Sequence, residues 1–335
     1  MTTAEPTAGP LGARLRAALQ ERISYAVSEF AAAAALVVLF IALSIASPVF
    51  LSIDNLFQIA AQTTVVAIVA IAQTMIIITA GIDLSVGSVA ALSGVVGAMA
   101  IRDMGVPLLL AVVIAIGVGT VAGLVNGLLT TVARMNPFIA TLGMMSVARG
   151  TVYIVSGAVG VYGLPKAFQL LGNGQVYGFP LPVLILLVVA VGVAFLLSQT
   201  RFGSYLYAIG SNREAARRAG IAVRRRVTSV YALAGGLVGL AGIIAASRAS
   251  SGQPNFGIGL ELDVIAAAVI GGASLFGGQG RVVGTLIGAF LVALVHNGAV
   301  LLGINTFYQQ VIIGLIIWAA VYFDQFRRRR LEARE

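Results

Sequence analysis

Long apolar stretches separated by short polar segments occupy the chain from residue 30 to residue 323. A helix needs about 20 apolar residues to cross the hydrocarbon core of a bilayer. On this criterion the pattern predicts about ten membrane-spanning helices, at 30–47, 57–80, 85–101, 107–132, 137–156, 180–198, 228–249, 263–279, 283–302 and 307–323. Two of these stretches, 85–101 and 263–279, are short enough for a partly re-entrant path. The pattern therefore predicts an all-α polytopic membrane protein.

The same pattern divides the chain into three parts. Residues 1–29 form a polar N-terminal segment, residues 30–323 the transmembrane domain, and residues 324–335 a basic tail. The first part contains no short apolar core followed by a small-residue cleavage site, so we do not expect a cleaved signal peptide.

Composition supports the membrane class and excludes several chemistries. Only 10% of the residues are charged, whereas soluble domains carry about 25%. The chain has no cysteine and a single histidine, His296. Disulfides, thiolate metal sites, cysteine nucleophiles and histidine-rich metal sites are thereby excluded. We therefore expect no catalytic residues, no metal and no cofactor.

The positive charges predict how the chain is oriented in the membrane. The net charge is +9, and all but four of the 21 basic residues lie in 1–29, 81–84, 133–136, 199–227, 280–282 and 324–335. The four exceptions are Arg102, Arg149, Lys166 and Arg248. Basic residues remain on the cytoplasmic side, where they also contact anionic lipid head groups. Both termini are therefore expected in the cytoplasm, and the charge indicates contact with the lipid membrane and no nucleic-acid partner.

A polar segment inside the loop 199–227 has the signals of a short helix. Ser211 and Glu214 have the spacing of a capping box, and Gly220 is suited to the left-handed turn that ends a helix. We expect Ala215, Ala216 and Ala219 to form a small-residue contact surface. An ordinary cytoplasmic loop and a docking helix for a soluble partner both fit this segment. Its candidate contact residues are Ser211, Asn212, Arg213, Glu214, Ala215, Ala216, Arg218 and Gly220.

Polar residues within or beside the apolar stretches, together with Phe138, are candidates for a translocation path or gate. An ionisable group inside a membrane is costly and often functional. The candidates are Gln62, Gln73, Thr74, Asp83, Asn126, Asn136, Phe138, Arg149 and Asn297. Structural roles compete with this interpretation. Asp83 fits the start of a helix, Asn136 fits an N-cap before Pro137, and the other amides and hydroxyls fit hydrogen bonds between helices.

Glycine is frequent, and its spacing indicates close helix packing. Small residues three or four positions apart allow helix backbones to approach each other in lipid. Two sets have this spacing: Gly117, Gly119, Gly123 and Gly127, and Gly235, Gly236, Gly239 and Gly242. The glycine-rich run 277–280 is not a phosphate-binding loop, because no lysine follows it.

Four motifs together resemble a known family. Residues 214–220 match the EAAxxxG core by which permeases of bacterial ABC importers engage their ATPase. Many relatives have another residue at the first position of this motif, whereas this chain has the glutamate, Glu214. Residues 81–88, 136–144 and 267–278 resemble the ribose-type branch of monosaccharide permeases. The resemblance extends over residues 30–323.

The resemblance implies an architecture, partners and a location. It implies a type II ABC importer arrangement in the bacterial inner membrane, with two permease subunits, as a homodimer, around one path. It also implies a separate ABC ATP-binding subunit and a periplasmic or extracellular sugar-binding protein. The cargo would be a ribose-like pentose or a hexose. The chain itself has no phosphate loop, so ATP hydrolysis would belong to the partner.

Other functions remain open at this stage. Permeases of this kind also carry nucleosides, autoinducer-like sugars or polyols, and the sequence does not separate these cargoes. An ion-coupled secondary transporter is a further alternative, although such proteins usually have several carboxylates at mid-membrane. A membrane enzyme or a scaffold is the least supported, because the residues of a catalytic set are missing.

Overall fold

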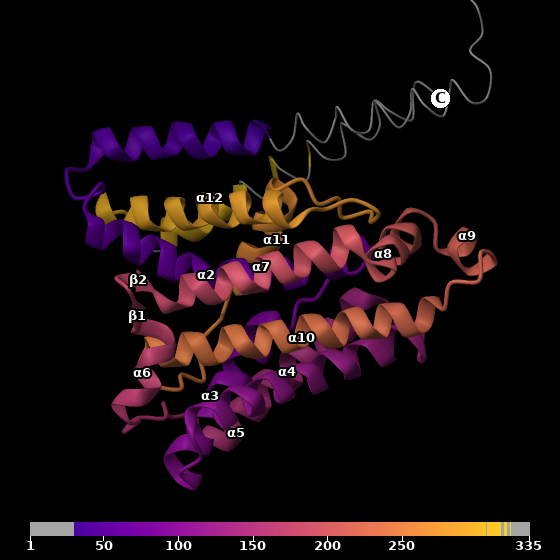
Figure 1. Cartoon of the computed structure of the whole chain (residues 1–335), viewed down its shortest axis with the longest axis horizontal. Coiled ribbons are helices and arrows are strands. Elements are labelled where there is room, and N and C mark those ends of the chain that lie inside the picture. The colour runs from indigo at the N-terminus through magenta and orange to yellow at the C-terminus, as the bar shows by residue number, and fades with distance from the viewer. Residues whose placement is uncertain (1–29, 306, 316–317, 320–321, 323–335) are drawn as a thin grey trace, which may run out of the picture.

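The computed structural model describes residues 30–305, 307–315, 318–319 and 322, and these residues are mostly helical (Figure 1). Within the described residues, seven helices are long and apolar enough to cross a membrane: α2 (Ile53–Ile78), α3 (Val86–Met104), α4 (Leu108–Thr131), α5 (Pro137–Ser156), α7 (Leu181–Gln199), α10 (Val223–Arg248) and α12 (Val282–Leu301). A shorter apolar helix, Phe30–Ala46, precedes them. The prediction of an all-α polytopic membrane protein is thus confirmed. The predicted segments 1–29 and 324–335, and parts of 307–323, lie outside the described residues.

Shorter elements lie at the two ends of the helix bundle (Figure 1). One end carries α8 (Arg201–Ser211) and α9 (Arg213–Arg218), and we call it the α9 end. The opposite end, called the α6 end, carries α6 (Lys166–Asn173) and a small antiparallel hairpin. In this hairpin β1 (Gln175–Val176) pairs with β2 (Phe179–Pro180), with Gln175 opposite Pro180 and Val176 opposite Phe179.

The predicted span 263–279 is not one continuous helix. Its helical part, α11 (Leu260–Ile270), has 11 residues. At 1.5 Å per residue this helix is about 16 Å long, which is about half of the hydrocarbon core. The following residues are irregular, because Gly272, Gly277 and Gly278 have positive φ angles that a helix does not contain. The other short stretch, 85–101, belongs to the full-length helix α3.

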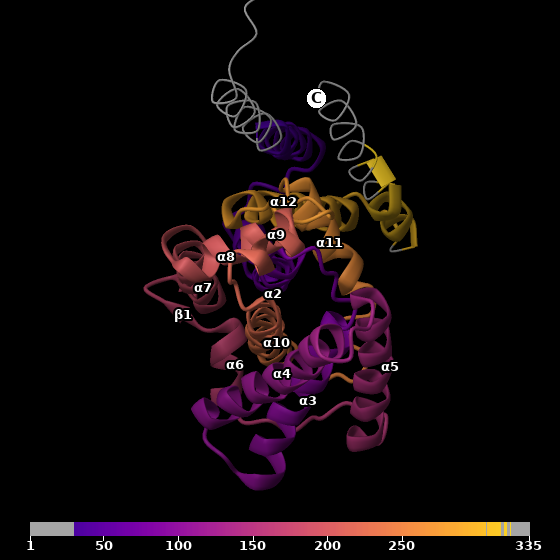
Figure 2. The same ribbon diagram turned by 90° about the vertical axis from the view of Figure 1, so that its right-hand side faces the viewer.

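Helix α10 lies at the centre of the bundle and packs against α2, α3 and α4 (Figure 2). Its contact with α4 is backbone to backbone. A Cβ atom on Gly119 would lie 2.1 Å from the carbonyl oxygen of Gly235, and one on Gly123 would lie 2.1 Å from that of Tyr231. The two predicted glycine stripes therefore interlock. There are two exceptions: a Cβ on Gly117 meets no atom within 4 Å, and one on Gly242 would lie 2.1 Å from the Ala90 carbonyl oxygen on α3.

Four connections meet at the α9 end. The main-chain N–H of Gly278 donates to the carbonyl oxygen of Ile78 at 2.9 Å, which joins the coil 271–281 to the end of α2. The hydroxyls of Thr131 and Thr228 are 2.8 Å apart, which joins the end of α4 to the beginning of α10. The sequence segments 81–84, 133–136, 199–227 and 280–282 therefore share one end, as the charge pattern predicts.

Candidate coupling helix and buried polar junction

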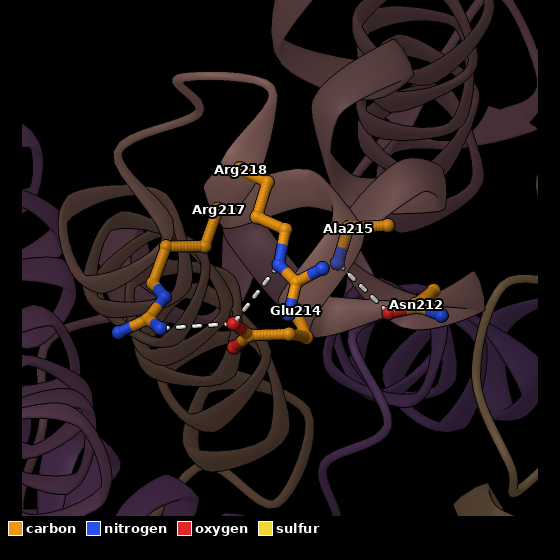
Figure 3. Close-up of polar contacts among 5 residues, drawn as sticks. All are labelled: Asn212, Glu214, Ala215, Arg217 and Arg218. Atoms are coloured by element: carbon orange, nitrogen blue, oxygen red, sulfur yellow. Dashed lines mark hydrogen bonds and ion pairs between the residues drawn. The ribbon is translucent and has the colours of Figure 1, made fainter.

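Helix α9 is a separate turn between α8 and α10, and its N-cap is Asn212. The Asn212 Oδ1 atom accepts a hydrogen bond from the main-chain N–H of Ala215 at 2.9 Å (Figure 3). The predicted capping box from Ser211 to Glu214 is wrong, because α8 continues through Ser211. Asn212 is the first residue with an extended backbone, at φ −156°, and only from such a position does a side chain reach the free N–H groups.

The predicted end of this helix is confirmed. Gly220 has a φ angle of +82°, and the N–H of Ile221 donates to the carbonyl oxygen of Ala216 at 3.1 Å. This bond pattern, with a glycine in the left-handed conformation, closes the helix and covers its last free carbonyl groups.

Glu214 forms ion pairs instead of capping the helix. Its Oε1 atom lies 2.9 Å from Arg217 Nη2 and 3.4 Å from Arg218 Nε (Figure 3). All three side chains are more than half exposed, and such surface pairs contribute at most about 1 kcal/mol. They therefore form a charged, accessible surface, and they add little to the stability of the fold.

The three alanines of α9 do not share one face. Ala216 is 4% exposed and belongs to the same apolar cluster as Val223, so it attaches α9 to the bundle. Ala215 and Ala219 are exposed. The expectation that all three form a contact surface is therefore wrong for Ala216, because the buried side of so short a helix has a single position. The accessible small-residue surface consists of Ala215 and Ala219.

Helix α8 fixes α9 to the membrane helices. A Cβ atom on Gly210 would lie 1.8 Å from the Ile78 carbonyl oxygen and 2.4 Å from the Gly278 nitrogen, so only glycine allows this approach. The Tyr207 hydroxyl donates to the Gly280 carbonyl oxygen at 2.8 Å. Burial raises the pKa of Tyr207, and Arg281 opposes this shift, so the hydroxyl keeps its proton. Helix α8 is thus in direct contact with the end of α2 and with the coil 271–281.

The coil 79–85 between α2 and α3 contains a buried polar junction. Asp83 is 5% exposed, and its Oδ1 atom accepts hydrogen bonds from the Ser85 main-chain N–H at 2.7 Å and the Ser85 hydroxyl at 2.6 Å. The Asn126 amide donates to Asp83 Oδ2 at 3.3 Å and to Ser85 Oγ at 3.0 Å. The predicted position of Asp83 beside a helix start is confirmed, and Asn126 connects it to α4.

Two further side chains attach this coil to the neighbouring helices. Gln73, on α2, bonds the N–H and the carbonyl of Asp83 at 3.1 and 3.2 Å when its amide is oriented to satisfy both. Thr141, on α5, accepts from the Leu84 N–H at 3.2 Å and donates to the Ile82 carbonyl oxygen at 3.2 Å. The buried polar junction, defined as Gln73, Asp83, Ser85, Asn126 and Thr141, therefore connects the coil to α2, α4 and α5.

Sequence reasoning missed two members of this junction. Ser85 follows Asp83 by two residues, and this Asp-x-Ser spacing is a recognisable turn signal. Thr141 carries no comparable signal, because an isolated threonine in an apolar helix usually bonds a carbonyl of its own helix. The Thr141 hydroxyl also lies 2.9 Å from Pro137 O, so its single proton is shared between this carbonyl and that of Ile82.

The remaining candidates are scattered. Thr74 bonds Thr285 at 2.7 Å, and Asn297 bonds Asn55 at 2.8 Å, so both connect α2 to α12. Gln62 is exposed on α2. Among the sequence-predicted path residues, the structure brings together Gln73, Asp83 and Asn126 only.

The other three candidates lie on α5. Asn136 accepts from the Phe138 N–H at 2.9 Å, with Pro137 at the first helical position, so its predicted N-cap role is confirmed. Phe138 is half exposed. Arg149 donates to the carbonyl oxygens of Pro254 and Phe256, which supplies the partner that the sequence did not reveal.

Neutralising Asp83 is expected to destabilise the fold. Asp83→Asn removes one of the two acceptor oxygens of a buried group, which costs about 1–3 kcal/mol. The melting temperature in detergent should fall clearly below that of the wild type. Asp103→Asn is the matched control, because Asp103 pairs with Arg102 on the surface. Equal melting temperatures for the two variants would contradict a structural role for the junction.

Comparison with known proteins places this helical membrane chain among transport permeases. Residues 55–321 match the family described as "Branched-chain amino acid transport system / permease component". The ribose import permease protein RbsC of Escherichia coli K12 is 44% identical over 87% of this chain and 91% of its own length. The L-arabinose ABC transporter permease protein AraH of Azospirillum brasilense is 39% identical over 88% of this chain and 87% of its own length. No solved structure matches the chain.

These findings define the class, namely a membrane-embedded permease component of a transport system. The family description refers to branched-chain amino acids, but the RbsC protein of Bacillus subtilis, at 42% identity over 87% of this chain, is again a ribose permease. The chain belongs to the permease family of ABC importers, in the branch that contains the ribose import permeases.

Proposed function

We propose that this chain is the transmembrane subunit of an ATP-driven importer that translocates a monosaccharide, either a ribose-like pentose or a hexose. The observation that carries the proposal is α9, an accessible helix attached through α8 to the ends of α2 and the coil 271–281. The relatives support the cargo, since they are named for ribose, D-allose and L-arabinose. The family assigns ATP hydrolysis to a separate subunit, so the chain itself is non-catalytic.

The partners follow from the two ends of the bundle. We place the ATP-binding subunit against α9 in the cytoplasm and the sugar-binding protein at the α6 end. The arginine distribution supports this orientation, because the segments that meet at the α9 end contain Arg134, Arg201, Arg213, Arg217, Arg218, Arg224, Arg225, Arg226 and Arg281. We further propose about ten spans in the type II arrangement, both termini in the cytoplasm of a bacterium, and a homodimer around a shared path.

Coupling would proceed through the contacts of α8. When the ATP-binding subunits close, they push α9, and Ala216 and the α8 contacts convey this movement to Ile78 and Gly278. The buried polar junction then carries the displacement from the coil 79–85 to α4 and α5. Rocking of these rigid helices would alternate access between the two ends.

Removing the N-cap of α9 is expected to weaken coupling. Asn212→Ala deletes the bond to the Ala215 N–H and costs about 1 kcal/mol of helix stability. ATP hydrolysis that is stimulated by the sugar-loaded binding protein should fall, while the amount of inserted permease stays the same. Asn212→Asp, which retains an N-cap acceptor, should restore it. Equal stimulation in the alanine variant and the wild type would contradict the role of this cap.

A transport assay in vesicles tests the cargo. Vesicles containing the complete complex should accumulate D-ribose, D-allose or L-arabinose when ATP is supplied to the ATP-binding subunit. Accumulation of a nucleoside or a polyol, with none of these three sugars transported, would replace the monosaccharide proposal by the other cargo class.

A further inference from the structure

Helices α3 and α11 both begin inside the bundle and meet there. A Cβ atom on Gly87, in the first turn of α3, would lie 2.0 Å from the Gly257 carbonyl oxygen and 3.0 Å from Glu261 Oε2. The connection 249–259 therefore turns back from the α6 end before α11 begins. Glu261, in the first turn of α11, has its carboxylate at this meeting point.

The meeting point lies near half depth. A Cβ atom on Gly94 of α3 would lie 2.6 Å from the carbonyl oxygen of Gly242 on α10. Gly242 is nineteen residues into α10, about 28 Å from its beginning at the α9 end. Gly87 precedes Gly94 by seven residues, or about 10 Å. Gly87 and Glu261 therefore lie level with a point about 18 Å from the beginning of α10, which is about 39 Å long.

Arg149 lies at a similar depth and next to this carboxylate. It is twelve residues into α5, which is again about 18 Å from the α9 end. Its Nη1 atom donates to Pro254 O at 2.7 Å and to Phe256 O at 2.9 Å, so the returning connection fixes its position. The Phe256 carbonyl that it bonds directly precedes Gly257, whose carbonyl oxygen lies with Glu261 Oε2 at the meeting point with Gly87.

The two acidic residues of α11 have different surroundings. Asp263 is paired with His296 on α12 at 3.3 Å, which attaches α11 to its neighbour. Glu261 is only partly buried, and its carboxylate forms no hydrogen bond or ion pair within the described part of the chain. A partly exposed carboxylate at half depth is too costly to face lipid, so its open side faces water or protein.

Helix α5 exposes small and polar side chains beside Arg149, among apolar ones. The exposed side of α7 carries large apolar residues, namely Leu187, Val188, Val191 and Phe195. The exposed side of α5 also carries apolar residues, Val147 and Ile154, but next to Arg149 it has Gly143, Ser146 and Gly150. Small and polar side chains at this depth suit a path or a protein contact better than acyl chains.

The small, partly open cavity nearby does not offer an alternative sugar site. It lies between α3, α10 and the connection 249–259, and is lined by residues that include Gly94, Gly242, Ser251, Gln253 and Phe256. Its volume of about 30 Å³ admits one or two water molecules at most. The polar face of α5 and α11 is therefore the better place for a solute to pass.

We propose that Arg149 and Glu261 face the translocation path at half depth and hydrogen-bond to the hydroxyl groups of the sugar in transit. A guanidinium offers only donors and a carboxylate only acceptors, so together they satisfy both roles of neighbouring sugar hydroxyls. Because the two charges compensate each other, the pair suits a neutral solute. This inference rests on the proposed function, since it assigns residues to the passage of the same cargo.

The absence of native cysteine makes a direct test possible. Glu261→Cys is introduced into the complete complex, reconstituted in vesicles, and treated with a charged, membrane-impermeant methanethiosulfonate reagent. We expect modification at least about tenfold faster than for Val188→Cys, because the reactive thiolate forms only in contact with water. Ser146→Cys, a near-isosteric change one turn before Arg149, keeps both Arg149 and Glu261 and should react equally fast. Whichever of D-ribose, D-allose or L-arabinose the wild-type vesicles accumulate should slow the modification of Ser146→Cys.

The outcomes separate this inference from the proposed function. Modification of Glu261→Cys and Ser146→Cys at the rate of Val188→Cys would overturn it. Fast modification of Ser146→Cys that the transported sugar does not slow would also overturn it. A second measurement is the uptake KM of Glu261→Gln, expected to rise at least about tenfold when a hydrogen bond to a charged group becomes one to an amide. An unchanged KM would also overturn it. Failure of the proposed function shows instead as wild-type vesicles that accumulate no monosaccharide.

Discussion

Replacing Ala219 on α9 with tryptophan should reduce ATP-driven uptake to near background while the chain still inserts and folds. Ala219 is exposed and lies beside the exposed ion pairs of Glu214, so the indole would occupy the space that the ATP-binding subunit needs. Disrupting a central interface position costs about 2 kcal/mol or more, which corresponds to roughly 30-fold weaker association. Uptake and stimulated ATP hydrolysis are measured in reconstituted vesicles.

The matched control is Ala133→Trp. Ala133 is an exposed alanine at the α9 end, in the connection between α4 and α5. It lies outside α9, where we place the ATP-binding subunit. This variant should retain uptake close to the wild type. If Ala219→Trp transported sugar as well as Ala133→Trp, then α9 would not be the coupling element. Ala216 is unsuitable for this test because it is buried in the core.

Replacing Gly123 with leucine should prevent the permease from folding into a stable bundle. A Cβ atom at Gly123 would lie 2.1 Å from the Tyr231 carbonyl oxygen, so α4 and α10 would have to separate along the contact at the centre of the fold. Overpacking costs about 1–3 kcal/mol when neighbouring side chains can move aside. Here the neighbour is main chain, which cannot move aside in this way, so the cost should be higher. We expect aggregation or loss of the monodisperse peak in size-exclusion chromatography in detergent.

The same substitution on the same helix provides the control. Gly117 lies six residues earlier on α4, and a Cβ atom there meets nothing within 4 Å. Gly117→Leu should give normal yield and an unchanged or slightly raised melting temperature, since glycine costs a helix interior about 1 kcal/mol. Comparable behaviour of the two variants would show that the predicted backbone contact between α4 and α10 does not determine stability.

Much of the helical architecture was predictable, because its signals are local. Apolar length located α5 at its observed bounds and α2, α4, α7 and α12 within a few residues. Gly220 marked the end of α9 and Asn136 the start of α5, since a positive φ angle and an N-cap each depend on a few neighbouring residues. The glycine spacing indicated that α4 and α10 each pack closely against another helix, but it did not show that they pack against each other.

The parts that were not predictable depend on tertiary contacts. The stretch 263–279 is apolar by hydropathy, but hydropathy does not show that α11 ends at Ile270 and that an irregular coil follows. Ser211 satisfied the capping-box spacing, yet α8 extends through it and leaves the cap to Asn212. The junction around Asp83 joins residues from three helices and a coil, which no single stretch of sequence reveals.

The most direct test of the central claim is sugar accumulation by purified permease in vesicles, with and without its ATP-binding subunit. With that subunit, ATP and the sugar-loaded binding protein, we predict accumulation against a gradient. The permease alone should build none, whatever ion gradient is imposed. Accumulation by the permease alone that an uncoupler abolishes would instead identify an ion-coupled transporter and contradict the account.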